Sequence, residues 1–244
     1  MPTCPSHLGP SPETAAGPAA VGGSAPGPGG PARTVVRAVG ERSLLAELSA
    51  TPEVHALAAE VRRTCGELLR DLVPGARTLL AVVGDPADLP RVADALGTPP
   101  PPVEETGPGR LFEIPVRYDG PDLADVAEHT GLAVAEIAAT HADVEHTVAF
   151  FGFAPGFGYL DGLPEALRVP RLPSPRVRVE AGGVAIAGGQ SVIYPGGTPG
   201  GWYIIGHAWG SPGAGSGGVP LWRPDREPPT LFQPGDRVVF RESR

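Results

Sequence analysis

The chain has 244 residues, 41 % of them apolar, and a formal net charge of −8. This length fits one large domain or two small ones with a buried core, and the negative charge argues against nucleic acid as a partner. No apolar run is long enough to span a membrane. With no secretory signal at the start and only Cys4 and Cys65 as cysteines, we expect a cytoplasmic protein without disulfides.

The sequence contains no lysine, so all 19 basic residues are arginines. A Walker A phosphate loop, a Schiff-base lysine and a covalently attached biotin each need a lysine side chain, so this sequence excludes all three. If the protein uses ATP, the phosphates are bound in another way or together with a partner.

Residues 1–33 are dominated by Gly, Pro, Ala and Ser, a composition that predicts a disordered tail. Residues 34–98 predict a small α+β domain. Its expected elements, in chain order, are strands at 34–39 and 43–48, a helix that begins at Pro52 and whose apolar spacing continues through Leu69, a strand at 77–83 and a helix at 90–96.

Residues 99–110 predict a proline-rich linker, and residues 111–241 predict a second, β-rich domain. In its first strand Pro115 indicates a sheet edge or a bulge, and Asp122 is suited to cap the first of two short helices. The expected elements are a strand at 111–118, helices at 122–130 and 134–141, and from Thr147 on a compact barrel or sandwich of short apolar strands (VAFFGF, VAIA, SVIY, WYIIG, RVVF) between Gly/Pro turns.

Two glycine-rich segments with aromatic residues are candidates for a ligand pocket: FGFAPGFGY at 151–159 and YPGGTPGGW at 194–202. Glycine lets the backbone approach a ligand and supplies amide donors, while aromatic side chains can wall a pocket. The alternatives are a tight crossover whose aromatics fill the core, and a hairpin loop pinned by two aromatics. The binding candidates are Phe153, Pro155, Gly156, Tyr159, Tyr194, Gly200, Gly201 and Trp202.

The proline-stiffened segment RVPRLPSPRVRV carries four arginines: Arg168, Arg171, Arg176 and Arg178. Arginine on a stiff segment is suited to bidentate binding of a carboxylate or phosphate. Surface ion pairing, for instance with Glu180, is the alternative for any one of them. Arg171 and Arg176, each directly after a proline, are the candidates for a functional role.

His141 and His146 lie five residues apart in HADVEH, whereas a helical zinc motif needs two histidines four apart. We therefore expect no metal site, and we expect His141 to end a helix near the pocket, beside its last carbonyls. Gln190 and Ser191 supply neutral hydrogen-bonding groups beside a glycine turn. Neither Ser191 nor Ser216 has the G-x-S-x-G context of a serine hydrolase.

Seven segments, in order and spacing, together resemble the allophanate hydrolase subunit 1 family, which includes the B subunit of 5-oxoprolinase, sporulation-kinase inhibitors and the carboxyltransferase modules (subdomain C and D type) of urea-carboxylating enzymes. The segments are EIPVRY, DLADVAEHTGL, the helix ending in His141, GFAPGFGYLDGLP, PRLPSPRVRV, GGQSVIYPGGTPGGWYIIG and LFQPGDRVVF. The resemblance runs from about Val35 to Phe240.

This resemblance implies an α+β protein with a small N-terminal domain and a cyclophilin-like β-barrel after it. It implies ATP-dependent hydrolysis of 5-oxo-L-proline to L-glutamate, active only with two partners. These are a homologous second barrel protein, of the type of allophanate hydrolase subunit 2 or the C subunit of 5-oxoprolinase, and a third protein of the type of its A subunit. ATP, with Mg²⁺ as an accompanying ion, would then be bound together with a partner.

The resemblance also leaves two alternatives open. One is a sensor-kinase inhibitor without catalysis. The other is a carboxyltransferase-type subunit that acts on urea or allophanate.

Opening a 5-oxoproline lactam requires activation of a stable amide, and phosphorylation of its oxygen by ATP would supply it. Such a step needs positive charge and oriented donors. Arg171 and Arg176 are the candidates for holding phosphate or the substrate carboxylate, and His141 is the candidate proton shuttle. The candidate donors are Gln190, Tyr194 and the amides of Gly156, Gly200 and Gly201.

The sequence departs from the family's usual pattern near the expected pocket. The changed positions are Glu180 and Gly183 where the family has VPAGS, Gly189 where it often has Asn, His207 where Arg is usual, and an inserted SPGAGSGG before Leu221. These departures leave the exact substrate open.

Overall fold

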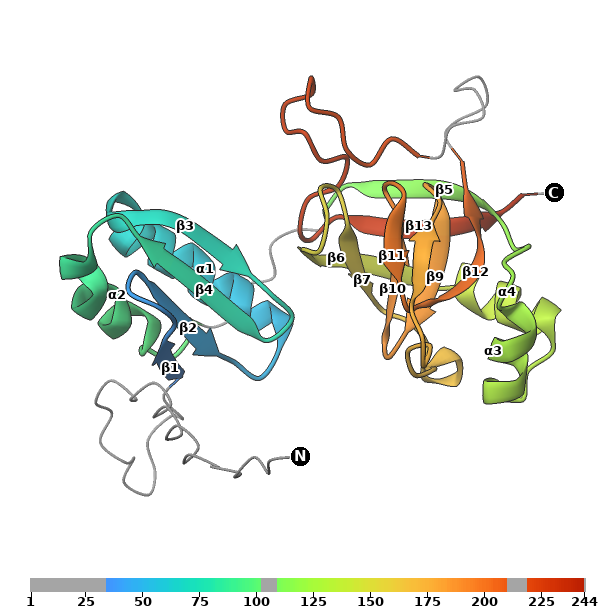
Figure 1. Cartoon of the computed structure of the whole chain (residues 1–244), viewed down its shortest axis with the longest axis horizontal. Coiled ribbons are helices and arrows are strands. Elements are labelled where there is room, and N and C mark those ends of the chain that lie inside the picture. The colour runs from blue at the N-terminus through green and yellow to red at the C-terminus, as the bar shows by residue number, and fades with distance from the viewer. Residues whose placement is uncertain (1–33, 102–108, 210–218, 244) are drawn as a thin grey trace, which may run out of the picture.

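The computed structural model describes residues 34–101, 109–209 and 219–243 (Figure 1). The expected disordered tail at 1–33, most of the expected linker and the glycine-rich insertion lie outside the described residues.

The N-terminal unit is a four-stranded sheet packed against two helices (Figure 1). Its elements are β1 (Val35–Ala38), β2 (Ser43–Glu47), α1 (Thr51–Cys65), β3 (Leu69–Pro74), β4 (Thr78–Val83) and α2 (Leu89–Leu96), with 3₁₀ turns at Gly66–Leu68 and Pro86–Asp88. The strand order is β1-β2-β4-β3. Residues between Leu44 and Leu96 build a hydrophobic core of their own in this unit.

Strand β3 was missed in the sequence-based expectation, which continued the first helix through Leu69. The helix ends at Cys65, and the chain passes through a 3₁₀ turn at Gly66–Leu68 before it pairs with β4. Leu68 and Leu69 continue the helical spacing of apolar residues by chance. Periodicity by itself cannot separate a short strand from the last turn of a helix.

The C-terminal unit is a closed seven-stranded barrel with two helices and a separate two-stranded ribbon (Figure 1). Its elements are β5 (Leu111–Arg117), α3 (Leu123–Thr130), α4 (Val134–Ala142), β6 (Glu145–Phe151), β7 (Gly158–Asp161), a 3₁₀ turn at Glu165–Leu167, β8 (Arg176–Val179), β9 (Gly183–Ala187), β10 (Gln190–Ile193), β11 (Thr198–Gly200), β12 (Tyr203–Ala208) and β13 (Arg237–Glu242). The expected α+β fold class, with a β-barrel after a small α+β unit, is confirmed.

The barrel order is β10-β7-β6-β13-β5-β12-β9, and β9 pairs with β10 to close it. The expectation that Pro115 marks a sheet edge or a bulge is wrong, because β5 lies between β13 and β12 in regular register. The structure tolerates this proline because β5 pairs with β12 only at Val116 and Arg117, so no amide is needed at Pro115 on that side.

Strands β9, β10 and β12 are buried on both faces, which is unusual for an antiparallel barrel. Alternate residues, such as Ile186 and Ile205, point into the barrel and join its main core. The residues between them, such as Ala185 and Ile204, join a second cluster with Phe157, Tyr194 and Trp202. This second cluster lies on the outer wall of the barrel, so that wall is also shielded from solvent.

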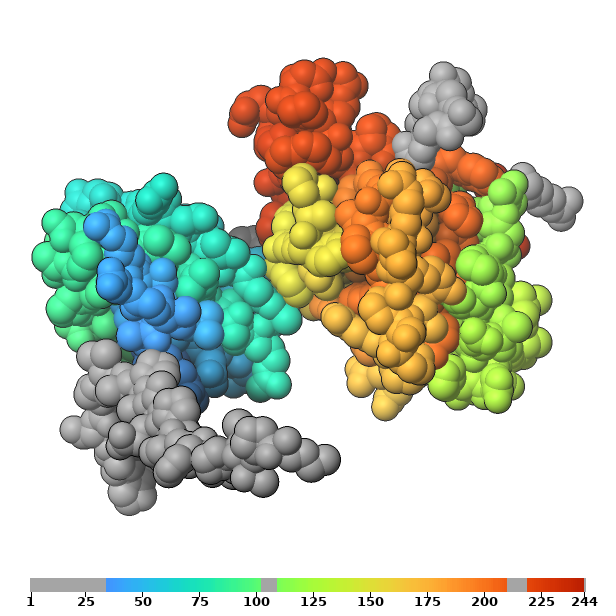
Figure 2. Space-filling model, in the orientation of Figure 1, coloured from blue at the N-terminus to red at the C-terminus, as the bar shows by residue number. Residues whose placement is uncertain are grey.

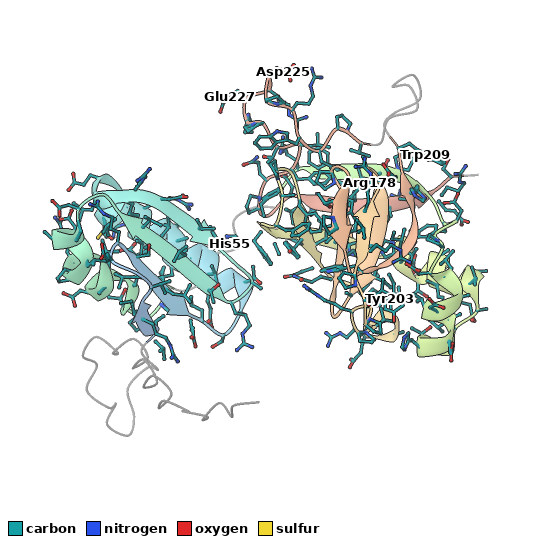
Figure 3. All side chains as sticks on the ribbon, viewed as in Figure 1. His55, Arg178, Tyr203, Trp209, Asp225 and Glu227 are labelled. Carbon is teal, nitrogen blue, oxygen red and sulfur yellow. The ribbon has the colours of Figure 1, made fainter. Side chains whose placement is uncertain are left out.

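Among the described residues, one side-chain hydrogen bond bridges the two units. The imidazole of His55, on α1, lies 2.6 Å from the carbonyl oxygen of Ala149 on β6, and Figure 3 shows His55 on the side of the N-terminal unit that faces the barrel. Figure 2 shows the residues around 225 as a lobe above the barrel. No helix among the described residues combines the length and apolar character that a membrane crossing requires.

Two histidines are enclosed between α4, β6 and β13. His141 and His146 are fully buried, with ring centroids 5.0 Å apart, and both pack against Phe240. Neither ring nitrogen of His146 has a hydrogen-bond partner among the described residues. Burial lowers the pKa of His146 to about 4, although the main chain of His141 and Asp161 partly offsets this.

Acid should therefore destabilise the barrel. An unfolded histidine takes up a proton near pH 6.5, whereas folded His146 stays neutral until about pH 4, so stability is lost as the pH falls through this window. The expected loss from His146 is about 3 kcal/mol. The variant His146→Leu should lose correspondingly less free energy of unfolding between pH 7 and pH 4, measured by urea titration. An equal pH dependence in both proteins would contradict this account.

Candidate ligand cavity

A cavity of about 350 Å³ lies on the outer wall of the barrel, between that wall, the β8–β11 ribbon and the loop before β7. This volume is in the range of small-molecule sites. The lining residues are Phe153, Phe157, Tyr159, Arg171, Leu172, Pro175, Tyr194, Pro199, Gly200, Gly201 and Trp202. The cavity thus brings together seven of the residues that the sequence suggested for a site, from all three motifs.

The segment YPGGTPGGW forms an excursion that leaves the barrel and returns to it. Tyr194 follows β10 and Trp202 precedes β12, and both side chains are buried against the outer wall. The residues between them form β11, which pairs with β8. Phe157 meets Tyr194 edge to face at 5.2 Å, and Tyr159 meets Trp202 at 5.9 Å. The two aromatics therefore anchor the ribbon and also form part of the cavity wall.

Gly200 is required by the closeness of Tyr194. A Cβ atom on Gly200 would lie 2.3 Å from the Tyr194 hydroxyl oxygen and 2.9 Å from Val179 Cγ2, distances that real Cβ atoms do not show. The absence of a side chain therefore lets β11 lie directly over the tyrosine. Gly196, in the same excursion, has nothing within 4 Å of the equivalent point.

Gly200→Ala should therefore destabilise the protein, by about 1–3 kcal/mol as in other overpacked sites. Gly196→Ala is the matched control from the same excursion, and it should unfold at the wild-type temperature. Thermal unfolding followed by circular dichroism compares the two. Equal melting temperatures for both variants would show that the ribbon can move away from Tyr194 at no cost.

Arg171 is the cation of the cavity wall. Its guanidinium lies 5.7 Å from the centre of the Trp202 ring, and none of the described carboxylates forms an ion pair with it. A guanidinium over an aromatic face keeps its charge and its donors available. Arg171 is thus free to bind a carboxylate or phosphate that enters the cavity.

Two phenol groups complete the polar part of the wall. Burial raises the pKa of both Tyr159 and Tyr194, and the charge of Arg171 partly opposes this shift. Arg176 and the backbone amide of Trp202 also favour the ionised form of Tyr194, more weakly than burial disfavours it. Both hydroxyls therefore remain protonated at neutral pH and can donate hydrogen bonds.

Phe153 stands at the rim with a strained backbone. Its φ is +66°, and the amide of Ala154 donates to the carbonyl of Gly152 at 2.7 Å, so the three residues form a γ-turn of the rare positive-φ kind. Its side chain is 63 % exposed although it lines the cavity. A bulky residue held in this conformation at the rim of the cavity makes Phe153 a candidate for a functional role.

Arg176 does not line the cavity, although it was suggested beside Arg171. Its Nη2 donates to the carboxylate of Asp122, which is 4 % exposed and also accepts the backbone amide of Ile204 at 2.7 Å. Its Nη1 is buried without a partner among the described residues. The expectation that Asp122 caps α3 through its side chain is wrong, because both carboxylate oxygens are used to join β8 and β12.

Removing Arg176 should cost stability. Arg176→Ala leaves the buried carboxylate of Asp122 without its counter-charge, and breaking such pairs costs about 3 kcal/mol. Arg178, on the same strand, pairs with Glu180, and both side chains are largely exposed, so Arg178→Ala should change stability by less than about 0.5 kcal/mol. Urea unfolding of the two variants tests this difference, and equal stabilities would mean that Asp122 and Arg176 separate in solution.

His141 is not placed for the role of proton shuttle in the cavity, for which it was the candidate. It is fully buried in α4, where Nδ1 lies 2.8 Å from the Tyr118 hydroxyl and Nε2 lies 3.0 Å from the Ser191 hydroxyl. Burial, and then the neighbouring His146, lower its pKa well below the usual value. His141 does lie in the last turn of α4, as expected. It is enclosed in the core and does not line the cavity, so the structure contradicts its expected place near the pocket. No described cluster of three metal-ligating side chains includes it.

The remaining suggested residues lie beside the cavity, not in its wall. Gln190 donates to Asp161 at 2.7 Å where β10 pairs with β7. Pro155 and Gly156 belong to the loop before β7, and Gly156 packs against the backbone of Leu221. Four lining residues are not among the candidates expected from the sequence: Phe157, Leu172, Pro175 and Pro199. All four lie within the three quoted motifs. Their closeness in the sequence to Arg171 and to the aromatic candidates could therefore have identified them.

Residues 34–232 match the family model described as the carboxyltransferase domain, subdomain C and D. Over 134 residues the chain is 47 % identical to the B subunit of 5-oxoprolinase from Escherichia coli O157:H7, an alignment that covers 54 % of this chain and 57 % of that protein. The chain thus spans little more than half the length of the curated relatives that it matches.

Two solved structures are similar over most of the chain. The crystal structure of TTHA0988 aligns with a TM-score of 0.67 and 37 % sequence identity, covering 83 % of this chain and 40 % of that one. The urea carboxylase of Kluyveromyces lactis aligns with a TM-score of 0.63 and 15 % identity, covering 86 % of this chain and 22 % of that one. The second likeness shows a shared fold alone.

Proposed function

The chain belongs to the carboxyltransferase domain, subdomain C and D family, and from this premise we propose that it is a subunit of an ATP-dependent 5-oxoprolinase that hydrolyses 5-oxo-L-proline to L-glutamate. The relative from E. coli O157:H7 is named as the B subunit of 5-oxoprolinase. The proposal assigns to this chain the binding of the lactam substrate, and to its partners the rest of the reaction.

The observation that carries the proposal is Arg171, a cation in an aromatic cavity, without a carboxylate partner among the described residues. The substrate 5-oxoproline is a small ring with a planar amide and one carboxylate. Arg171 would bind the carboxylate through charge-assisted hydrogen bonds. The rings of Tyr159, Tyr194 and Trp202 would hold the flat lactam and exclude water from it.

The wall of the described cavity offers no ligands for a nucleotide and its metal ion. Mg²⁺ with ATP requires oxygen ligands, chiefly carboxylates, but the cavity wall contains neither a carboxylate nor a histidine. The sequence also lacks the lysine of a phosphate-binding loop. We therefore assign ATP, its metal ion and the proton-transfer groups to the two partners, the homologous barrel protein and the third protein.

An assembly assay tests the function directly. The chain, co-purified with its two partners, should release glutamate from 5-oxoproline only when ATP is present, while the chain by itself should not. An intact assembly without this activity would reject the proposal. Turnover of urea or allophanate instead of 5-oxoproline would support a carboxyltransferase-type subunit. Binding of a sensor kinase without turnover of any of these substrates would support a regulatory protein.

Arg171→Met tests the substrate contact within that assembly. Methionine keeps the bulk over Trp202 but removes the charge, and a hydrogen bond to a charged group contributes about 1.5–3 kcal/mol. The KM for 5-oxoproline should therefore rise about 10- to 100-fold. Arg168→Met is the matched control, because Arg168 lies beside Gly189 outside the cavity wall, and its KM should equal that of the wild type. Equal KM values for the two variants would place the carboxylate elsewhere.

A further inference from the structure

Four side chains in the described wall of the cavity carry an O–H or N–H group: Tyr159, Arg171, Tyr194 and Trp202. Tyr194 and Trp202 are only 1 % and 6 % exposed, and Gly200 lies directly over the Tyr194 hydroxyl. Arg171 is exposed and Tyr159 is partly exposed. A ligand in the cavity can therefore reach Arg171 and Tyr159 most readily.

The hydroxyl of Tyr159 is also available to a ligand because no neighbour uses it. The chain has four tyrosines. The hydroxyl of Tyr118 meets His141 at 2.8 Å, and that of Tyr203 meets His129 at 2.9 Å. The Tyr159 hydroxyl, in contrast, has no hydrogen-bond partner among the described residues, although its side chain lines the cavity. A phenol in an aromatic wall normally finds a partner for its O–H group, and here a ligand would provide it.

We infer that Tyr159 and Arg171 together bind the carboxylate of the substrate, and that Tyr159 is a specificity-determining residue that makes the cavity select lactams with a carboxylate. The inference rests on the proposed function for the identity of the ligand, and it adds a second group to the carboxylate contact of Arg171. No bond forms or breaks at Tyr159, since its hydroxyl keeps the proton and donates a hydrogen bond.

A bound carboxylate needs more donors than Arg171 supplies. Its two oxygens accept about four hydrogen bonds, and the fork of a guanidinium provides about two of them. A carboxylate that leaves water for an aromatic cavity loses affinity for each position that stays unpaired. Tyr159 can provide a further donor, because burial raises the pKa of its phenol and the hydroxyl is protonated at neutral pH.

The two side chains are placed to meet one carboxylate. The Arg171 guanidinium lies 5.7 Å from the centre of the Trp202 ring, and the centre of the Tyr159 ring lies 5.9 Å from the same point. In the proposed function the lactam oxygen is phosphorylated by ATP that the partners hold, so this oxygen must face the partners. The donors of the cavity wall are therefore left for the carboxylate.

Tyr159 is held in place by strand pairing and by aromatic contacts. It lies in β7, opposite Phe150 on β6 and Val192 on β10, and its ring stacks on Phe150 at 4.4 Å with an interplanar angle of 13°. The ring of Phe157 meets it edge to face at 5.2 Å. A donor fixed in this way loses little freedom when a ligand binds. The hydroxyl can therefore discriminate between ligands, because it does not adapt to them.

Ligand binding to the full chain, without ATP or partners, tests the inference. An NMR titration compares 5-oxoproline with 2-pyrrolidone, which is the same lactam without the carboxylate. Tyr159→Phe keeps the stacked ring and removes only the hydroxyl. The Kd for 5-oxoproline should therefore rise about 10-fold, while the Kd for 2-pyrrolidone should change by less than about twofold. An unchanged Kd for 5-oxoproline, or an equal rise for both ligands, would overturn the inference.

Tyr203→Phe is the matched control. The Tyr203 hydroxyl meets His129 inside the main core, so this variant also loses a phenol oxygen but should bind both ligands as the wild type does. Tyr159→Phe should keep the wild-type melting temperature, because the Tyr159 hydroxyl has no partner among the described residues. A clearly lower melting temperature would show that this hydroxyl has a structural role, and that result would count against the inference.

A double-mutant cycle identifies the group of the ligand that Tyr159 meets. The double variant combines Arg171→Met with Tyr159→Phe. If both residues bind one carboxylate, its loss of affinity for 5-oxoproline should be smaller than the product of the two single losses, because each donor depends on the carboxylate position that the other sets. Losses that simply multiply would place the hydroxyl on another part of the ligand, contrary to the inference.

These outcomes are distinct from those that decide the proposed function. An assembly of three subunits that releases no glutamate from 5-oxoproline would reject the proposed function, while the titrations of the chain by itself would still decide the carboxylate site. An active assembly in which Tyr159→Phe keeps the wild-type KM for 5-oxoproline would reject the role of Tyr159 and leave the proposed function in place.

Discussion

The carboxylate of Asp122 links three parts of the C-terminal unit. It precedes α3, accepts the amide of Ile204 on β12 and pairs with Arg176 on β8. A buried charge is stable only when it is paired and hydrogen-bonded. The ribbon of β8 and β11 is therefore held against the barrel by an ion pair. Its loss would leave the buried carboxylate of Asp122 without a counter-charge.

The cavity results from the way the β8–β11 ribbon and the loop before β7 cover the outer wall of the barrel. Strands β9, β10 and β12 carry apolar residues on both faces, so the outer wall must be shielded from water by the ribbon and by the loop before β7. Prolines and glycines line the edge of this shield and leave a space open beneath it. This space is the cavity, and aromatic side chains form most of its wall. Arg171 enters this space from the stiff segment before β8, with its charge unpaired among the described residues.

The different environments of the histidines and the tyrosines follow from the same arrangement of barrel interior and covered outer wall. On the inner side of the barrel, burial lowers the pKa of His141 and His146 and keeps both neutral, and both rings pack against Phe240. On the outer wall Tyr159 is partly exposed and Tyr194 is buried at the base of the cavity, and burial keeps both protonated. His141 and His146 therefore belong to the core, whereas Tyr159, Tyr194 and Arg171 line the cavity.

Most strands and helices could be predicted from the sequence, because apolar periodicity and Gly/Pro punctuation are local signals. The strand β3 was not expected, because its apolar residues continue the helical spacing of α1. The short strands β7, β8 and β11 were not expected either, because they lie within glycine- and proline-rich motifs. The aromatic and glycine motifs around Tyr159 and Trp202 also predicted part of the cavity wall correctly, since residues at both ends of a tight excursion return to one place.

The sequence by itself determined that the chain forms a small α+β unit followed by a β-barrel, and that arginine, in place of lysine, supplies every basic side chain. It could not decide which arginine meets a ligand, because Arg171 and Arg176 have equivalent local contexts. Only the tertiary structure separated them. Asp122, 54 residues earlier in the chain, neutralises Arg176, while no carboxylate of the described residues reaches Arg171. Pairing between distant residues is set by the way the layers pack, which no local pattern encodes.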